Sequence, residues 1–275
     1  NCNCLSDWSM MLRFPKSYYE SSPKAGTIRQ LAATPQTEQI VEQVADDAVS
    51  KDAPIADRTP QVAAAAVDTS WLPFAAKTYK ISPDLADYVI VNIPICPSDI
   101  PNRNGVAFPL AELIAYQPPP LARLTYKAWT GCPVHLEHDN EDHEKAIGVI
   151  FDTSLRVMRG YGSGKHYVVY GLIGIDRKKD PETAEKFRTG AMDTGSMGAL
   201  AEYFTCSVCG HASTDNQFTN CAHIKSTKDV NWKIVDHEGQ KVLAYLNAHV
   251  LSPIEFSAVA DPAWATCLTD MVLAR

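Results

Sequence analysis

The sequence predicts a β-rich α+β domain with few helices. Short runs of β-branched and aromatic residues, bounded by proline or glycine, recur from residue 88 onward and predict strands. One segment in that region carries a full set of helix start and stop signals. A chain of 275 residues that is 45% hydrophobic is long enough to bury one substantial core.

Three strands are predicted in the first part of the domain, and two of them flank a glycine-rich loop. Residues 88–93 are β-branched and lie between prolines, which favours a strand. Residues 146–151 and 167–173 lie on either side of the glycine-rich segment 160–164. We expect these two runs to form an antiparallel pair joined by a long loop.

One helix is predicted at residues 181–189. Asp180 is a favourable cap, Pro181 suits the first helical position and Glu182 places an acidic group in the first turn. Gly190 is the expected terminating residue, because glycine adopts the left-handed conformation that ends helices.

The C-terminal part of the chain is predicted to hold a hairpin and a last strand. The hairpin joins strands at 232–235 and 241–245 through a turn at 237–240, which contains His-Glu-Gly-Gln. The last strand is expected at 254–259, directly before Asp261-Pro262.

The chain is predicted to consist of an N-terminal arm and linker at 1–69 and one domain at 70–275. Residues 33–68 are rich in Ala, Gln, Asp, Glu and Thr and contain three prolines, which is typical of an extended linker. Aromatic residues before this linker suggest a docking arm.

Composition excludes several classes of partner. A formal charge of −7 argues against binding to nucleic acid, which requires a clustered basic surface. There is no run of 18 apolar residues and no signal-peptide pattern after Cys4, so neither a membrane partner nor secretion is expected. The eight cysteines form no regular disulfide framework, which favours reduced thiols, metal ligation and a cytosolic compartment.

The clearest chemical signal is a set of metal-type ligands. Cys206-x-x-Cys209 is followed after eleven residues by Cys221-x-His223. Three thiolates and one imidazole at this spacing predict a closed, tetrahedral structural zinc site in a knuckle at about 204–225. Free buried thiols are the alternative.

A candidate nucleophile precedes this knuckle. Gly195-Ser196-Met197-Gly198 is expected to form a tight turn, in which the glycines let main-chain amides point toward an oxyanion. A serine between glycines is more often only part of a turn, so the residues alone leave both interpretations open.

A polar cluster upstream could activate that serine. It consists of His135, Glu137, His138, Asp139, Asp142 and His143. A catalytic metal site and a solvated acidic loop are both compatible with this composition. His138 is singled out, because the apolar run at 146–151 follows shortly and would fix the loop against a core.

The order of five motifs resembles the prohead (head-maturation) proteases of tailed bacteriophages, which are similar in fold to the herpesvirus assemblins. The resemblance covers roughly residues 71–270. The motifs are Pro101-Asn102-Arg103-Asn104-Gly105, Leu136-Glu137-His138, Ala146-Ile147-Gly148-Val149-Ile150, Gly195-Ser196-Met197-Gly198 and Glu255-Phe256-Ser257-Ala258-Val259-Ala260-Asp261-Pro262-Ala263.

The resemblance implies a closed or partly closed antiparallel barrel-like sheet that carries a serine endopeptidase. His138 matches the general base and Ser196 the nucleophile, with amides near Met197 and Gly198 as the oxyanion donors. The enzyme is expected to act inside the assembling prohead or virion, in the host cytoplasm, and to cleave scaffold and capsid proteins and itself.

The third catalytic residue is less sharply defined by the sequence. Glu255 in the last motif is the preferred residue to orient His138, and Asp152 and His249 are its rivals.

Two other functions remain open at this level. One is a non-catalytic structural or scaffold-associated virion protein on the same fold, and the other is a zinc-stabilised binding module. A homo-oligomer is compatible with each of the three functions.

Overall fold

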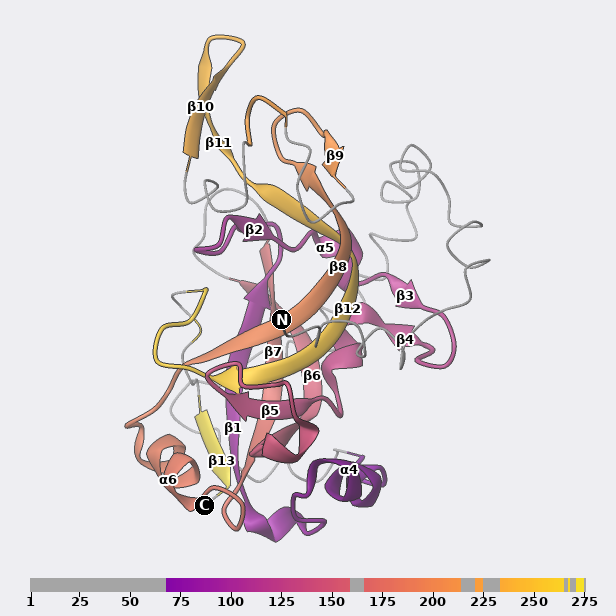
Figure 1. The fold of residues 1–275 in the computed structure, drawn as a ribbon, viewed down its shortest axis with the longest axis vertical. Coiled ribbons are helices and arrows are strands. Elements are labelled where there is room, and N and C mark those ends of the chain that lie inside the picture. The colour runs from indigo at the N-terminus through magenta and orange to yellow at the C-terminus, as the bar shows by residue number, and fades with distance from the viewer. Residues whose placement is uncertain are drawn as a thin grey trace, which may run out of the picture. The chain divides into compact units, whose positions relative to one another are not determined.

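The computed structural model describes residues 68–158, 166–213, 221–224, 233–264, 267 and 271–274 (Figure 1). The described chain has an α+β fold, with most of its regular structure in a mixed sheet and few helices, which confirms the predicted class. The predicted arm and linker lie outside the described residues, apart from Asp68 and Thr69.

The helices are short and lie in the connections between strands. They are α4 (Leu72–Tyr79), η4 (Leu85–Asp87), α5 (Leu110–Leu113), η5 (Thr125–Trp129), η6 (His143–Lys145) and α6 (Pro181–Thr189). None of the described helices has the length and apolar character needed to cross a bilayer.

The strands make up most of the described domain. They are β1 (Tyr88–Pro97), β2 (Val106–Ala107), β3 (Tyr116–Gln117), β4 (Arg123–Leu124), β5 (Pro133–Leu136), β6 (Gly148–Met158), β7 (His166–Asp176), β8 (Gly195–Cys206), β9 (Ala212–Ser213), β10 (Lys233–His237), β11 (Gln240–Ala244), β12 (Leu246–Ala258) and β13 (Met271–Ala274).

The main sheet has the order β13-β1-β7-β6-β5-β12-β8-β9, with β2 also paired to β12. Its pairs are antiparallel except those of β12 with β5 and with β2, which are parallel. The prediction that the sheet is antiparallel is therefore wrong, because the sheet is mixed. Among the described strands, the pairing does not return from β9 to β13, so a closed barrel is not observed.

The predicted helix α6 is confirmed at both ends. The Asp180 carboxylate accepts a hydrogen bond from the Thr183 amide at 2.9 Å, and Gly190 ends the helix with φ of 77°. The helix buries Thr183, Ala184 and Phe187 against the domain.

Both predicted strand pairs are confirmed. β6 and β7 pair from Gly148↔Ile175 to Met158↔His166, and the glycine-rich segment 160–164 lies outside the described residues. β10 and β11 pair around Glu238 and Gly239, whose φ values of 53° and 79° are those of the two-residue hairpin turn.

The predicted last strand was too short and was not the last. β12 begins at Leu246, and β13 follows it. The predicted strand covers only the part of β12 after Pro253. The ladder with β8 shifts register between Pro253 and Glu255, so the strand continues through a bulge.

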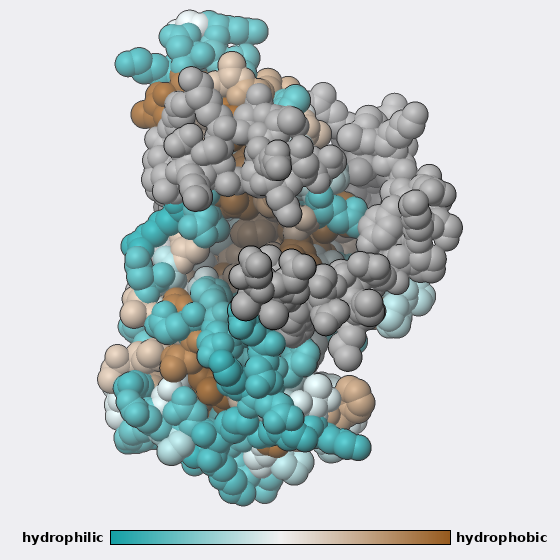
Figure 2. Space-filling model, viewed as in Figure 1, coloured by the Kyte–Doolittle hydropathy of each residue, from teal (hydrophilic) through white to brown (hydrophobic). Residues whose placement is uncertain are grey.

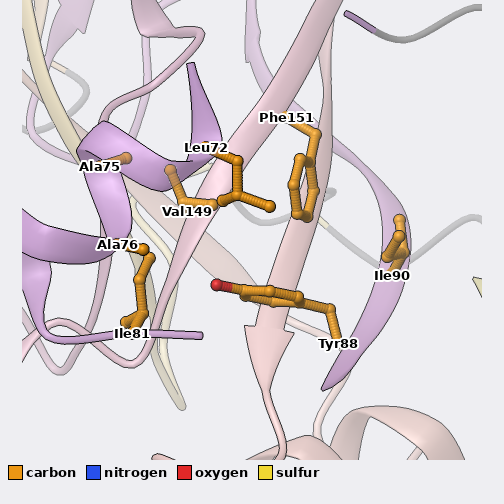
Figure 3. Close-up of a cluster of buried hydrophobic side chains, with 8 residues drawn as sticks. All are labelled: Leu72, Ala75, Ala76, Ile81, Tyr88, Ile90, Val149 and Phe151. Atoms are coloured by element: carbon orange, nitrogen blue, oxygen red, sulfur yellow. The ribbon is translucent and has the colours of Figure 1, made fainter. Parts of the chain in front are cut away.

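One hydrophobic cluster joins α4 to the β1–β7–β6 part of the sheet (Figure 3). Tyr88 and Phe151 meet edge to face with ring centroids 5.2 Å apart, and Leu72 and Val149 pack beside them. Figure 2 shows that the region around α4 and α6 is mostly hydrophilic, whereas apolar surface is visible nearer the middle of the same face. The cluster fixes β6, the strand that pairs with β5 and so supports the loop bearing His138.

Candidate active site and metal centre

Ser196 lies in an extended strand, so the predicted tight turn at 195–198 is wrong. β8 begins at Gly195 and pairs with β12, with Ser196 opposite Ser257. A Cβ atom at Gly195 would lie 1.9 Å from the Phe256 ring, so packing of that ring accounts for the glycine. The glycines that suggested a turn are required by close approach of side chains from β12.

The second glycine makes room for a carboxylate. Gly198 lies opposite Glu255, and a Cβ atom at 198 would be 2.6 Å from Glu255 Oε1. Residues directly opposite each other in an antiparallel pair project to the same face. Ser196, Ser257 and Glu255 are therefore brought to one face of the β8–β12 pair.

His138 reaches this face from the end of β5. β5 runs parallel to β12, and the Glu137 amide donates to the Ala258 carbonyl at 2.9 Å. The His138 amide donates to Ser257 Oγ at 3.2 Å. Glu137 and His138 have φ values of 50° and 59°, in the left-handed region that non-glycine residues rarely adopt. These bonds to β12 hold a strained turn whose effect is to aim the imidazole.

The His138 ring is bonded to a buried carboxylate. Nδ1 of His138 lies 2.8 Å from Glu255 Oε1, and the Glu255 side chain is 0% exposed whereas that of His138 is 45% exposed. The Ser257 hydroxyl donates to the other oxygen, Glu255 Oε2, at 2.6 Å. Because an ionised carboxylate can only accept, this arrangement places the imidazole proton on Nδ1 and leaves Nε2 as the basic nitrogen.

Neither rival of Glu255 contacts His138. Asp152 pairs with Lys127, with 2.9 Å between the carboxylate oxygen and Nζ. His249 is bonded through Nδ1 to Glu112 at 2.9 Å and through Nε2 to the Thr205 hydroxyl at 2.8 Å.

The environment raises the pKa of His138 above its usual value. The hydrogen bond to Glu255 is the main cause and outweighs burial, which lowers the pKa, while the charges of Glu255 and Glu137 add to the increase. These surroundings thus favour the positively charged imidazole. A general base needs such stabilisation, because it becomes positively charged when it accepts a proton.

Ser196 and His138 line the same pocket, which has a volume of about 350 Å³. Ser196 is buried, with 8% of its surface exposed. Among the described residues no hydrogen bond joins its hydroxyl to the His138 ring. Catalytic hydrogen bonds are often long or poorly aligned until substrate is bound, and here the two side chains line one pocket.

The predicted oxyanion donors belong to β8 as well. Met197 and Gly198 lie opposite Phe256 and Glu255 in the ladder. In the described part of the chain, β9 pairs only with residues 204 and 205, so the first part of β8 is paired on one edge alone. Amides along a strand alternate between its two edges, so one of these two amides points away from β12 and toward the open edge.

The four predicted metal ligands come together. The ligand atoms of Cys206, Cys209, Cys221 and His223 all lie within 4.8 Å of one another. They are the one group of at least three metal-type ligands among the described residues, so the polar cluster around His138 does not form a metal site there. Nδ1 of His223 is buried without a hydrogen-bond partner, which fits a nitrogen that binds an ion.

One metal-type ligand belongs to a hydrophobic cluster that adjoins the pocket. Cys206 ends β8, at whose other end Ser196 lies, and packs with Ile224, Ala244 and Leu246. Val106 and Phe204 pack against this cluster and also line the pocket. An ion held by the four ligands would therefore support one wall of the pocket.

Ser257 is the residue of the candidate site that the sequence interpretation missed. Its hydroxyl bonds both the Glu255 carboxylate and the His138 main chain. The available signal was the Glu-x-Ser spacing, because residues two apart in a strand share a face.

Comparison with known proteins finds no matching family model, no matching curated protein and no matching solved structure. The chemistry of this site is therefore argued from its own geometry.

Proposed function

We propose that the chain is a serine endopeptidase with Ser196 as nucleophile, His138 as general base and Glu255 as the residue that orients the base. The observation that carries the proposal is the 2.8 Å bond from Nδ1 of His138 to the fully buried Glu255 carboxylate, since His138 and Ser196 line the same pocket. A nucleophile, a base and a group that orients the base are the parts that acyl transfer requires.

The reaction follows from these positions. His138 Nε2 takes the Ser196 proton as Oγ attacks the peptide carbonyl, and a β8 amide at Met197 or Gly198 donates to the resulting oxyanion. The imidazolium then gives its proton to the departing amine, which leaves an acyl-enzyme. Water, deprotonated by the same imidazole, hydrolyses that ester and restores Ser196.

The two partners of Glu255 define its role in this mechanism. The carboxylate keeps the Nδ1 proton in place and offsets the positive charge that His138 acquires in each transition state. Ser257 holds Oε2, and Gly198 leaves room for Oε1. The carboxylate is thus fixed without needing to move during the reaction.

The biological setting rests on the resemblance in motif order. In this proposal the enzyme matures phage proheads, where it cleaves scaffold and capsid proteins and itself. The partly closed barrel of that family is the corresponding proposal for the fold, and the pronounced curvature of β8 and β12 in Figure 1 supports it.

The Cys206, Cys209, Cys221 and His223 cluster is proposed to bind zinc. Three thiolates and an imidazole are a donor set that zinc prefers, and four protein ligands leave no open coordination position. The ion would therefore stabilise the knuckle and take no part in hydrolysis.

Covalent labelling tests the enzymatic proposal without a known substrate. A fluorophosphonate probe should add to wild-type chain once, at Ser196, and to neither Ser196→Ala nor His138→Ala, as read by intact and peptide mass. A folded, zinc-loaded wild-type chain that takes up no probe would favour the non-catalytic structural protein instead.

A further inference from the structure

The pocket beside Ser196 has an apolar wall. The larger apolar residues that line it include Ile95, Ile100, Val106, Phe108, Phe204 and Trp264. Its polar side chains are those of Asn102, Asn104, Ser196 and His138, and none of the described residues that line it is Asp, Glu, Lys or Arg. The pocket therefore offers hydrophobic contact and hydrogen bonds but no fixed charge except on His138.

Two charged groups beside the lining residues are already paired. Arg103, between the two lining asparagines, forms an ion pair with Asp261, and its amide donates to the Ala263 carbonyl at 2.8 Å. The Glu255 carboxylate is occupied by His138 and Ser257. Neither Arg103 nor Glu255 is thus available to neutralise a charge that enters the pocket.

The shape of the wall is set before any ligand arrives. Asn102 Oδ1 accepts hydrogen bonds from the amides of Asn104 at 2.9 Å and Val106 at 3.1 Å. The Gly105 carbonyl accepts from the Leu246 amide at 2.9 Å, which ties this loop to the start of β12. A pre-formed apolar pocket selects ligands by the apolar surface that they bury in it, because the pocket does not change shape to fit each ligand.

Resting on the proposed peptidase function, we propose that this pocket selects the substrate: it takes an uncharged, apolar side chain such as Leu, Met or Phe beside the scissile bond. A carboxylate or ammonium in the same place would lose its water without gaining an ionic partner, because His138 must be neutral to accept the Ser196 proton, and this loss is costly. A larger apolar side chain covers more of the wall than alanine does, and its extra buried carbons are together worth about tenfold or more in kcat/KM.

A peptide library read by mass spectrometry tests this selectivity. Cleavage sites from a mixture randomised on both sides of the scissile bond identify the position that the pocket reads. Defined peptides with Leu, Ala, Gln, Glu or Lys at that position then give kcat/KM, with rates normalised to the amount of enzyme that fluorophosphonate labels. We expect Leu to exceed Ala by about tenfold and to exceed Glu and Lys by about a hundredfold.

A matched pair of variants tests whether the wall sets this order. Phe108 lines the pocket and is half-buried, so a lysine there can place its amine at the pocket mouth. Phe108→Lys should raise the Glu-to-Gln ratio of kcat/KM by about tenfold. Phe108→Met is the control, because methionine is similar in length to lysine but carries no charge. This variant should have the wild-type Glu-to-Gln ratio.

The outcomes separate the two proposals. If Ser196 is labelled but Glu or Lys peptides are cleaved as well as Leu peptides, the selectivity is wrong while the peptidase function stands. A ratio unchanged by Phe108→Lys would also overturn the role of this wall. If Ser196 is neither labelled nor needed for cleavage, the peptidase function fails and the selectivity fails with it.

Discussion

At the residue scale, the site depends on one carboxylate that has no contact with solvent. Glu255 has a bonded partner on each oxygen, Nδ1 of His138 and the Ser257 hydroxyl. A buried carboxylate without such partners is strongly disfavoured, so the environment of Glu255 and the orientation of His138 support each other.

Replacing Glu255 tests that dependence. Glu255→Gln should lower kcat by roughly 10³- to 10⁴-fold, because an amide neither fixes the Nδ1 proton nor offsets the imidazolium charge. Cleavage of a peptide from the library assay measures the loss. Asp152→Asn is the control, since Asp152 pairs with Lys127 and should be dispensable for the reaction. Equal losses in the two variants would contradict the assignment of Glu255.

The raised pKa of His138 predicts a pH dependence. Below this pKa the imidazole is protonated and cannot accept the Ser196 proton, so kcat/KM should rise with pH, with a midpoint above about 6.5. In Glu255→Gln the main cause of the shift is lost, and the midpoint should move to lower pH. The rate of fluorophosphonate labelling between pH 5 and 9 measures both profiles. A midpoint that stays in place in the variant would show that Glu255 does not set the pKa.

At the scale of elements, the site is made where three strands from distant parts of the chain meet. β5 delivers His138, β8 delivers Ser196, and β12 lies between them and supplies Glu255 and Ser257. The position of each side chain is therefore set by the register of the β5–β12 and β12–β8 ladders, and a slip of one residue would move it to the opposite face.

Gly198 tests the fit between β8 and β12. Gly198→Ala places a Cβ atom 2.6 Å from Glu255 Oε1, so the carboxylate must shift and its bond to His138 should weaken. We expect a loss of roughly 10²-fold in the labelling rate of Ser196, because a shift of a catalytic group by up to about one ångström has an effect of this size.

The matched control is a glycine away from the site. Gly190 ends α6 in the left-handed conformation with open space around it. Gly190→Ala should cost roughly 1 kcal/mol in the free energy of unfolding and leave the labelling rate unchanged. Thermal unfolding and labelling, measured on both variants, separate loss of fit from loss of stability. Labelling of Gly198→Ala at the wild-type rate would mean that the carboxylate position is not critical.

At the scale of the whole described domain, the metal cluster and the active site are linked through a shared wall. Val106 and Phe204 pack against the hydrophobic cluster that contains Cys206, and both also line the pocket. Removal of the proposed zinc should therefore affect Ser196 chemistry as well as stability, although the proposed mechanism gives the ion no part in the reaction.

Metal analysis and chelation test this link. The purified chain should contain one zinc per molecule by elemental analysis, and a chelator should lower both the Tm and the labelling rate of Ser196. Cys221→Ser should lose the zinc, whereas Cys132→Ser, at a thiol outside the cluster, should keep it. An unchanged Tm in a chain without bound metal would refute the structural role.

Elements whose signals are local could be predicted from the sequence. The cap at Asp180, the terminator at Gly190 and the Glu238-Gly239 turn act within a few residues, so α6 and the β10–β11 hairpin could be predicted with their bounds nearly as observed. The ligand spacing of the knuckle is likewise local, and the four residues do meet.

The tertiary structure alone decided how the distant parts combine. Gly195 and Gly198 predicted a turn in the sequence, because their actual cause, the close approach of Phe256 and Glu255, comes from a strand about 60 residues away. The sequence already favoured Glu255, but its contact with His138 depends on the register of β12 with β5 and β8. Strand pairing of this kind is set by non-local contacts, which leave no signature in the spacing of either segment.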